Sequence, residues 1–243
     1  QLPLVSPALL ILGLSMGIRF ALAQLGGHPA EAGPLAMSPA VPAGFDVLAA
    51  VLVTLATGLV LHGYTHGYRH LHVTQLEVPV AGLEPGLDGL RIAHVSDLHM
   101  GPLCDRAALR HAFEETMAQG ADLICVTGDL VDSRHADLDR WVPELRALSA
   151  PLGVIAILGN HDFNAGLDRV ADAVRRHTDW CLLRDAVTTV ERDGARLHVA
   201  GLDHRNLGEA LEALPALVAR IPDDAPAAVL FHHPGTIEST AVE

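Results

Sequence analysis

Short apolar runs alternate with amphipathic stretches along the second half of the chain. Four runs have the length and composition of buried β-strands, and they cover residues 90–95, 123–126, 154–158 and 227–231. Two further strands fit residues 187–191 and 197–200, which the turn Arg192-Asp193-Gly194 joins. The pattern therefore predicts at least six strands with turn or helical segments between them.

The intervening stretches have helical periodicity. Asp105 can cap a helix that runs to about Gln119 with Leu109 and Phe113 on one face, and Gly120 can end it. Further helices are predicted at residues 139–148, 167–177 and 207–220. Because strands and helices alternate, the fold class is α/β.

The first quarter of the chain has a different pattern. Residues 2–18 carry no charge and remain mostly apolar to residue 25, and a second apolar run covers residues 47–61. Together they predict a transmembrane helical hairpin, with spans at about 2–25 and 45–64. The second run is short enough to be a buried core helix instead, and a signal peptide is a weaker alternative for the first because no basic segment precedes it.

The predicted organisation is thus a membrane region over residues 1–64, a linker over 65–88 and a catalytic domain over 89–243. No Lys or Arg lies between Arg19 and Arg69. The positive-inside rule then places the protein in the cell (inner) membrane with its catalytic domain in the cytoplasm. Three scattered cysteines offer no disulfide framework, which agrees with a reducing compartment, and Cys125 is expected to be a core residue.

The charge excludes one class of partner. The formal net charge is −13 and lysine is absent, so the chain has no basic patch for nucleic acid. A phosphate-bearing substrate would be repelled by such a surface unless bound metal ions supplied positive charge locally.

Polar clusters follow four of the predicted strands. They are Asp97-Leu98-His99, Gly128-Asp129, Gly159-Asn160-His161-Asp162 and His232-His233-Pro234. Open α/β sheets build their sites at the carboxyl ends of strands, so these side chains are expected to meet. Carboxylate, imidazole and amide oxygen suit Mn, Fe or Zn.

This ordered set of motifs resembles the calcineurin-like metallophosphoesterase family, and the segment Gly89-Leu-Arg-Ile-Ala-His-Val-Ser-Asp-Leu-His99 is similar to its membrane-anchored branch. The resemblance runs from about residue 90 to the end of the chain. It implies a four-layer α/β/β/α sandwich and a site with two divalent metal ions (Mn, Fe or Zn) in the complete protein.

The resemblance also implies a role for each motif residue. Asp97 and His99 would hold one ion, Asp129 would bridge both ions, and Asn160 and His232 would hold the other. A metal-bridging hydroxide would attack phosphorus, and His161 would stabilise charge or protonate the leaving oxygen. Asp162 is expected either to orient His161 or to cap a helix.

One family motif is missing. The closing GHxH, which would add two metal ligands, does not follow His232. Its absence and the lack of an initiator Met lead us to expect a piece of a longer protein, truncated before GHxH at the carboxyl end and starting downstream of the natural amino terminus.

The sequence therefore predicts a membrane-tethered metal-dependent phosphoesterase that hydrolyses a phosphodiester or phosphomonoester. A nucleotide-linked lipid precursor, a phospholipid headgroup and a soluble phosphodiester remain open as substrates. The alternative is a catalytically inactive membrane protein that uses a degenerate phosphoesterase domain to bind a phosphorylated ligand or partner.

Overall fold

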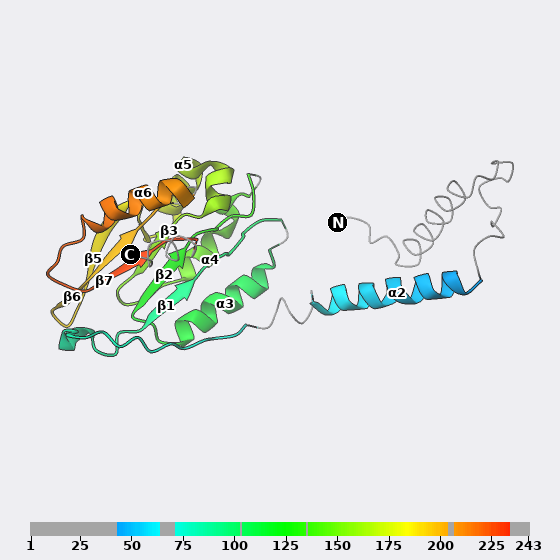
Figure 1. Cartoon of the computed structure of the whole chain (residues 1–243), viewed down its shortest axis with the longest axis horizontal. Coiled ribbons are helices and arrows are strands. Elements are labelled where there is room, and N and C mark those ends of the chain that lie inside the picture. Colours follow the sequence, from blue (N-terminus) through cyan, green and yellow to red (C-terminus); the bar gives the residue numbers. More distant parts are fainter. Residues whose placement is uncertain (1–42, 64–70, 103, 135, 204–206, 234–243) are drawn as a thin grey trace. The chain divides into compact units, whose positions relative to one another are not determined.

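The computed structural model describes residues 43–63, 71–102, 104–134, 136–203 and 207–233 (Figure 1). The chain divides into two compact units, residues 1–74 and residues 75–243. Each unit is described separately below.

The first unit contains helix α2 (Ala43–His62). Its large apolar side chains are exposed, including Leu55, Leu59 and Val60. Among the helices in the described part of the chain, none is long and apolar enough to cross a membrane. The predicted span over about 45–64 is therefore not supported: Asp46 and His62 bound its apolar run, which is shorter than the roughly 20 residues that a crossing needs. The predicted span over 2–25 lies outside the described residues.

The second unit contains two β-sheets. Strands β1 (Ile92–Val95), β2 (Leu123–Thr127), β3 (Val154–Ile157) and β4 (Cys181–Leu182) form a parallel sheet in that order. Strands β5 (Ala186–Arg192), β6 (Ala195–Gly201) and β7 (Ala227–Leu230) form the second sheet, in which β5 runs antiparallel and β7 parallel to β6.

Helices cover the outer face of each sheet. Those packed on the parallel sheet are α3 (Arg106–Ala118), the 3-10 turn η3 (Leu138–Trp141), α4 (Val142–Ala147) and α5 (Asn160–His177). Helix α6 (Leu207–Val218) packs on the second sheet, and the 3-10 turn η2 (Pro85–Leu87) contacts its strand β6. Figure 1 shows the strands between α6 and α3.

A separate apolar core lies between the two sheets. It contains alternate residues of the central strands, among them Leu123, Ile155, Leu197 and Val199. Cys125 belongs to this core as predicted, and burial raises the pKa of its thiol to about 12. The order helices, sheet, sheet, helix confirms the expected α/β/β/α sandwich for the described residues.

The predicted elements match the observed ones to within a few residues, with two exceptions. Strand β4 has only two residues and carries no periodic signal. Helix α5 begins at Asn160 rather than near Leu167, because the polar motif itself forms the first helical turn. Gly166 then interrupts the helix with a φ of 105°, a left-handed conformation that glycine adopts without steric penalty.

The buried carboxylate of Asp162 joins this first turn to the loop after β2. It accepts backbone hydrogen bonds from Gly159 N at 2.9 Å, Leu130 N at 3.2 Å and Val131 N at 3.0 Å. Burial raises the pKa of Asp162, which the three donating N–H groups counteract. Of the two roles expected for Asp162, the helix-capping role is the one that these contacts support.

We predict that Asp162→Asn destabilises the second unit by about 1–3 kcal/mol, because the amide nitrogen of Asn would face backbone N–H donors and leave them without an acceptor. Asp172→Asn is the matched control. The carboxylate of this exposed residue of the same helix pairs with Arg175 at 3.6 Å, and loss of such a surface pair is expected to cost less than about 1 kcal/mol. Urea unfolding measures the difference in the free energy of unfolding between the two variants. Equal unfolding midpoints would contradict the proposed role of Asp162 in joining α5 to the loop after β2.

Candidate metal centre

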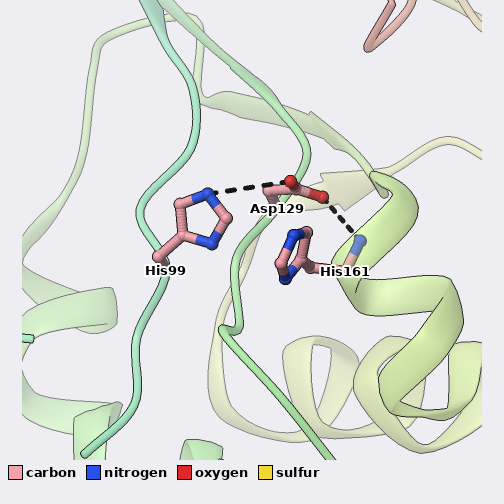
Figure 2. A group of neighbouring side chains, drawn as sticks. All are labelled: His99, Asp129 and His161. Atoms are coloured by element: carbon pink, nitrogen blue, oxygen red, sulfur yellow. Dashed lines mark hydrogen bonds and ion pairs between the residues drawn. The ribbon is translucent and has the colours of Figure 1, made fainter. Parts of the chain in front are cut away.

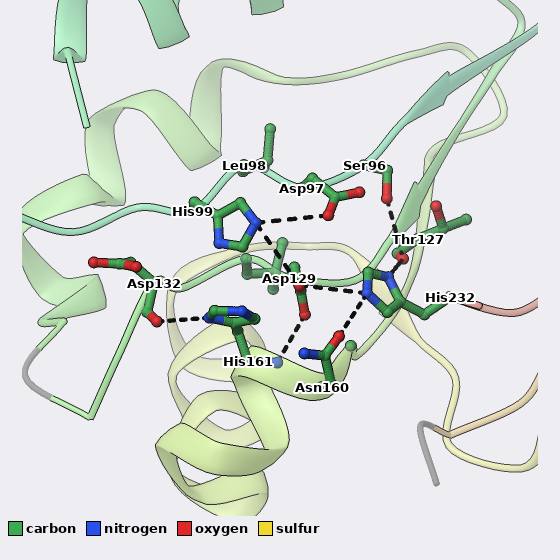
Figure 3. A network of polar contacts seen from close by, with 12 residues as sticks. Ser96, Asp97, Leu98, His99, Thr127, Asp129, Asp132, Asn160, His161 and His232 are labelled. Carbon is green, nitrogen blue, oxygen red and sulfur yellow. Dashed lines mark hydrogen bonds and ion pairs between the residues drawn. The ribbon is translucent and has the colours of Figure 1, made fainter. Parts of the chain in front are cut away.

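The predicted site residues all lie at the carboxyl ends of strands. Asp97 and His99 follow β1, and Asp129 follows β2. Asn160 and His161 form the start of α5 directly after β3, and His232 follows β7 of the other sheet. Figure 3 shows these six residues converging on one place.

The backbone at three of these residues has an unusual conformation. Asp97, His99 and Asp129 have φ values of 58°, 43° and 52°, which cost non-glycine residues roughly 1–2 kcal/mol each. Hydrogen bonds from Asp97 N to Gly128 O and from His99 N to Asp129 O hold the two loops together. Strain of this kind is typical of functional sites, where it directs side chains that a regular strand would point elsewhere.

The loops after β2 and β3 are in close contact. A Cβ atom at Gly159 would lie 2.2 Å from Asp129 Oδ1, and one at Gly128 would lie 2.6 Å from Gly159 N. Both positions therefore require glycine, which explains why Asp129 and Asn160 each follow one.

The carboxylate of Asp129 is the centre of the cluster (Figure 2). Its Oδ2 lies 3.8 Å from His99 Nε2 and 3.3 Å from His232 Nε2, and its Oδ1 accepts from His161 N at 2.8 Å. Asp97 Oδ1 lies 3.6 Å from His99 Nε2, and Asn160 Oδ1 lies 2.9 Å from His232 Nε2. Asp129 itself is almost completely buried.

These donor atoms fit divalent cations. Two groups have ligand atoms within 4.8 Å of one another: Asp97, Asp129 and His232, and His99, Asp129 and His161. Ligands of one six-coordinate ion at about 2.1 Å are roughly 3–4 Å apart, so small side-chain movements suffice. Asp129 belongs to both groups. Asp97 and His99 belong to different groups, but Asp97 Oδ1 and His99 Nε2 lie only 3.6 Å apart.

The contact between His232 and Asp129 shifts the pKa of both groups. The hydrogen bond to Asp129 raises the pKa of His232 to about 9, although burial opposes this. Burial alone would raise the pKa of Asp129, but hydrogen bonds from His232 and His161 lower it below its ordinary value. A metal ion must displace the His232 proton when it binds, since a protonated imidazole has no lone pair to offer.

Two backbone carbonyls orient the histidine rings. His232 Nδ1 donates to Thr127 O and His161 Nδ1 donates to Asp132 O, both at 2.8 Å. Because a carbonyl oxygen can only accept a hydrogen bond, Nδ1 of each ring must carry a proton. Nε2 is then the ring nitrogen that can bind a metal ion or transfer a proton. The His161 ring also packs edge-on against His99, with centroids 4.7 Å apart.

Sequence reasoning missed Thr127 and Asp132 because they act through their main chains. A carbonyl oxygen is present in every residue, so residue type gives no signal. They are identified by position in the fold: Thr127 ends β2 beside His232, which follows β7, and Asp132 lies in the loop after β2 beside His161 of α5.

Comparison with known proteins agrees with this geometry. Metallophosphoesterase YkuE of Bacillus subtilis is 26% identical over 74% of this chain and 65% of its own length. A bovine transmembrane protein with a metallophosphoesterase domain is 32% identical over 47% of this chain and 26% of its own length. The UDP-2,3-diacylglucosamine pyrophosphatase LpxG of Chlamydia trachomatis is 34% identical over 41% of this chain and 30% of its own length.

The chain thus spans at most about two thirds of the length of these relatives. The model of the calcineurin-like phosphoesterase family matches residues 90–237, which are more than half of the chain and include all six predicted site residues. The chain therefore belongs to the calcineurin-like phosphoesterase family.

Proposed function

We propose that this protein is a metal-dependent phosphoesterase that hydrolyses a phosphodiester or phosphomonoester. The observation that carries the proposal is the position of the Asp129 carboxylate, within 4 Å of His99 Nε2 on one side and His232 Nε2 on the other. Both imidazoles lie beside the same oxygen, Oδ2, so a cation held by either histidine would also have this buried carboxylate as a ligand.

In this proposal Asp97 and His99 hold one ion, Asn160 and His232 hold the other, and Asp129 bridges them. Mn, Fe and Zn are the candidates, since carboxylate, amide and imidazole ligands suit hard or borderline ions. When bound, the ions would neutralise the phosphoryl charge and lower the pKa of a water molecule enough for it to attack phosphorus.

His161 is proposed to be the catalytic acid. Asp132 O fixes its ring through Nδ1, so Nε2 can donate a proton to the leaving oxygen. His161 also lies in the first turn of α5, where backbone N–H groups favour an anionic group such as a phosphate.

We further propose that the substrate is membrane-associated or lipid-linked. LpxG, whose name specifies a diacylated sugar nucleotide as its substrate, is among the relatives, and so is a protein named for a transmembrane region. The exposed Leu and Val side chains of α2 support attachment of the amino-terminal unit to lipid. The absence of Lys and Arg between Arg19 and Arg69 favours a cytoplasmic position for the catalytic unit.

The catalytic roles can be separated by two substitutions. Asp129→Asn is expected to lower metal content and hydrolysis together, because the bridging carboxylate loses one of its charged oxygens. His161→Ala is expected to retain the metals and to lower turnover of bis(p-nitrophenyl) phosphate by roughly two to four orders of magnitude. Turnover with Mn²⁺ and elemental analysis of the same samples measure both effects.

His111→Ala provides the matched control, since His111 is an exposed residue of α3. It should change neither metal content nor turnover. Unchanged turnover in His161→Ala with metals bound would refute the acid role. A wild-type protein inactive on phosphoesters with every divalent metal tried would favour the non-catalytic binding protein.

Membrane attachment is tested by fractionation. The protein should stay with the lipid fraction through a carbonate wash, and removal of residues 1–72 should release the catalytic unit, because the apolar surface of α2 leaves with them. Recovery of the intact chain in the supernatant without detergent would contradict attachment.

A further inference from the structure

An open cavity of about 590 Å³ lies at the same edge of the sheets as the metal centre. Its lining includes Phe163 and Leu167 of α5, Glu209 and Glu212 of α6, Arg184 and Asp185 between β4 and β5, and Asp203 between β6 and α6. All of these belong to the described residues, and none is among the metal ligands.

The cavity and the metal centre use neighbouring positions of the same two regions. Gly201 of β6 pairs with Leu230 of β7, and Leu202 N donates to Leu230 O. Asp203 of the cavity and His232 of the metal centre each lie two residues beyond this last pair of the register. In the other region, Phe163 of the cavity follows His161 by two residues in the first turn of α5. A group attached to a phosphoryl group at the metal centre would therefore have the cavity within reach.

Arg184 is held by carboxylates within this lining. Its Nε donates to Asp203 Oδ2 and its Nη1 to Asp168 Oδ1, both at 2.8 Å. The hydrogen bond to Asp203 raises the pKa of Arg184, so the guanidinium remains charged and paired. Its pairing with two carboxylates makes Arg184 unsuitable as a receptor for a second phosphate.

The side of the cavity formed by α5 and the side formed by α6 differ in polarity. Phe163 is 55% exposed, and Leu167 lines the cavity just beyond the kink at Gly166. The wall from α6 presents the exposed carboxylates Glu209 and Glu212. A ligand that fits both walls needs an apolar face for the aromatic ring and hydrogen-bond donors for the carboxylates.

We propose that this cavity binds the alcohol half of the substrate and that this alcohol is a hydroxyl-rich ring of the sugar type. The C–H face of such a ring can pack on Phe163 while its hydroxyl groups donate to Glu209 and Glu212. Four carboxylates and one guanidinium line the cavity, so an anionic alcohol would be repelled. This inference rests on the proposed function, because the metal centre must hold the phosphoryl group.

Binding of non-hydrolysable phosphonates tests the proposal without depending on turnover. Calorimetry of the Mn²⁺-loaded protein would compare ethylphosphonate, 2-aminoethylphosphonate and the methylphosphonate analogue of a hexose 1-phosphate. The hexose analogue is expected to bind at least about tenfold more tightly than ethylphosphonate. Phe163→Ala and Glu212→Gln should each reduce this ratio about threefold or more and leave ethylphosphonate binding unchanged. Differences in affinity of threefold to tenfold correspond to the loss of one or two hydrogen bonds or packing contacts.

Glu191→Gln is the control, since Glu191 is an exposed residue of β5 that does not line the cavity. Equal affinity for the hexose analogue and ethylphosphonate, or a ratio unchanged in both cavity variants, would overturn the cavity proposal alone. Tighter binding of 2-aminoethylphosphonate than of the hexose analogue would overturn the assignment to sugars in favour of a cation. Failure of all three phosphonates to bind would overturn the proposed function as well.

Discussion

The contact between the loops that follow β2 and β3 controls the geometry of the metal centre. Gly128 and Gly159 allow the two backbones to touch, and the Asp162 carboxylate ties them together through three N–H groups. Asp129 and Asn160 extend from these two loops, so their separation is set by backbone contacts rather than by flexible side chains. Rigid placement of this kind keeps ligands close together before any cation arrives.

The same loops also stabilise the negative charge of a buried carboxylate. Asp129 is buried, and Asp97 and Asp162 lie nearby in a chain with a net charge of −13. In the metal-free protein, His232 and the backbone N–H of His161 stabilise the negative charge on Asp129. Bound cations would replace part of this stabilisation and make the edge of the sheets attractive to phosphate. With bound cations, an acidic protein would thus be able to bind an anionic substrate at this edge of the sheets.

The neighbouring cavity has the opposite character. Its carboxylates and apolar side chains are suited to the uncharged part of a molecule, whereas the metal centre is suited to the charged part. Both regions share α5, whose first turn contains His161 and Phe163. A kink at Gly166 separates that turn from the rest of the helix. In the proposed complex, one short segment would therefore contact both the phosphoryl group and the group attached to it.

The sequence alone determined the α/β class and the set of motif residues that meet at the strand ends, whereas the resemblance of these motifs to a known family implied the four-layer sandwich. These predictions succeed because strand periodicity and the order of the motifs are local properties of the chain. The tertiary structure alone decided that Asp162 joins two loops, that Thr127 and Asp132 orient histidines through their carbonyl groups, and that α5 and α6 line one open cavity. It also did not support a membrane span in α2, where hydropathy had predicted one. The roles of Asp162, Thr127 and Asp132 depend on contacts between residues about 30 to 100 positions apart. No pattern within a single segment can encode such contacts.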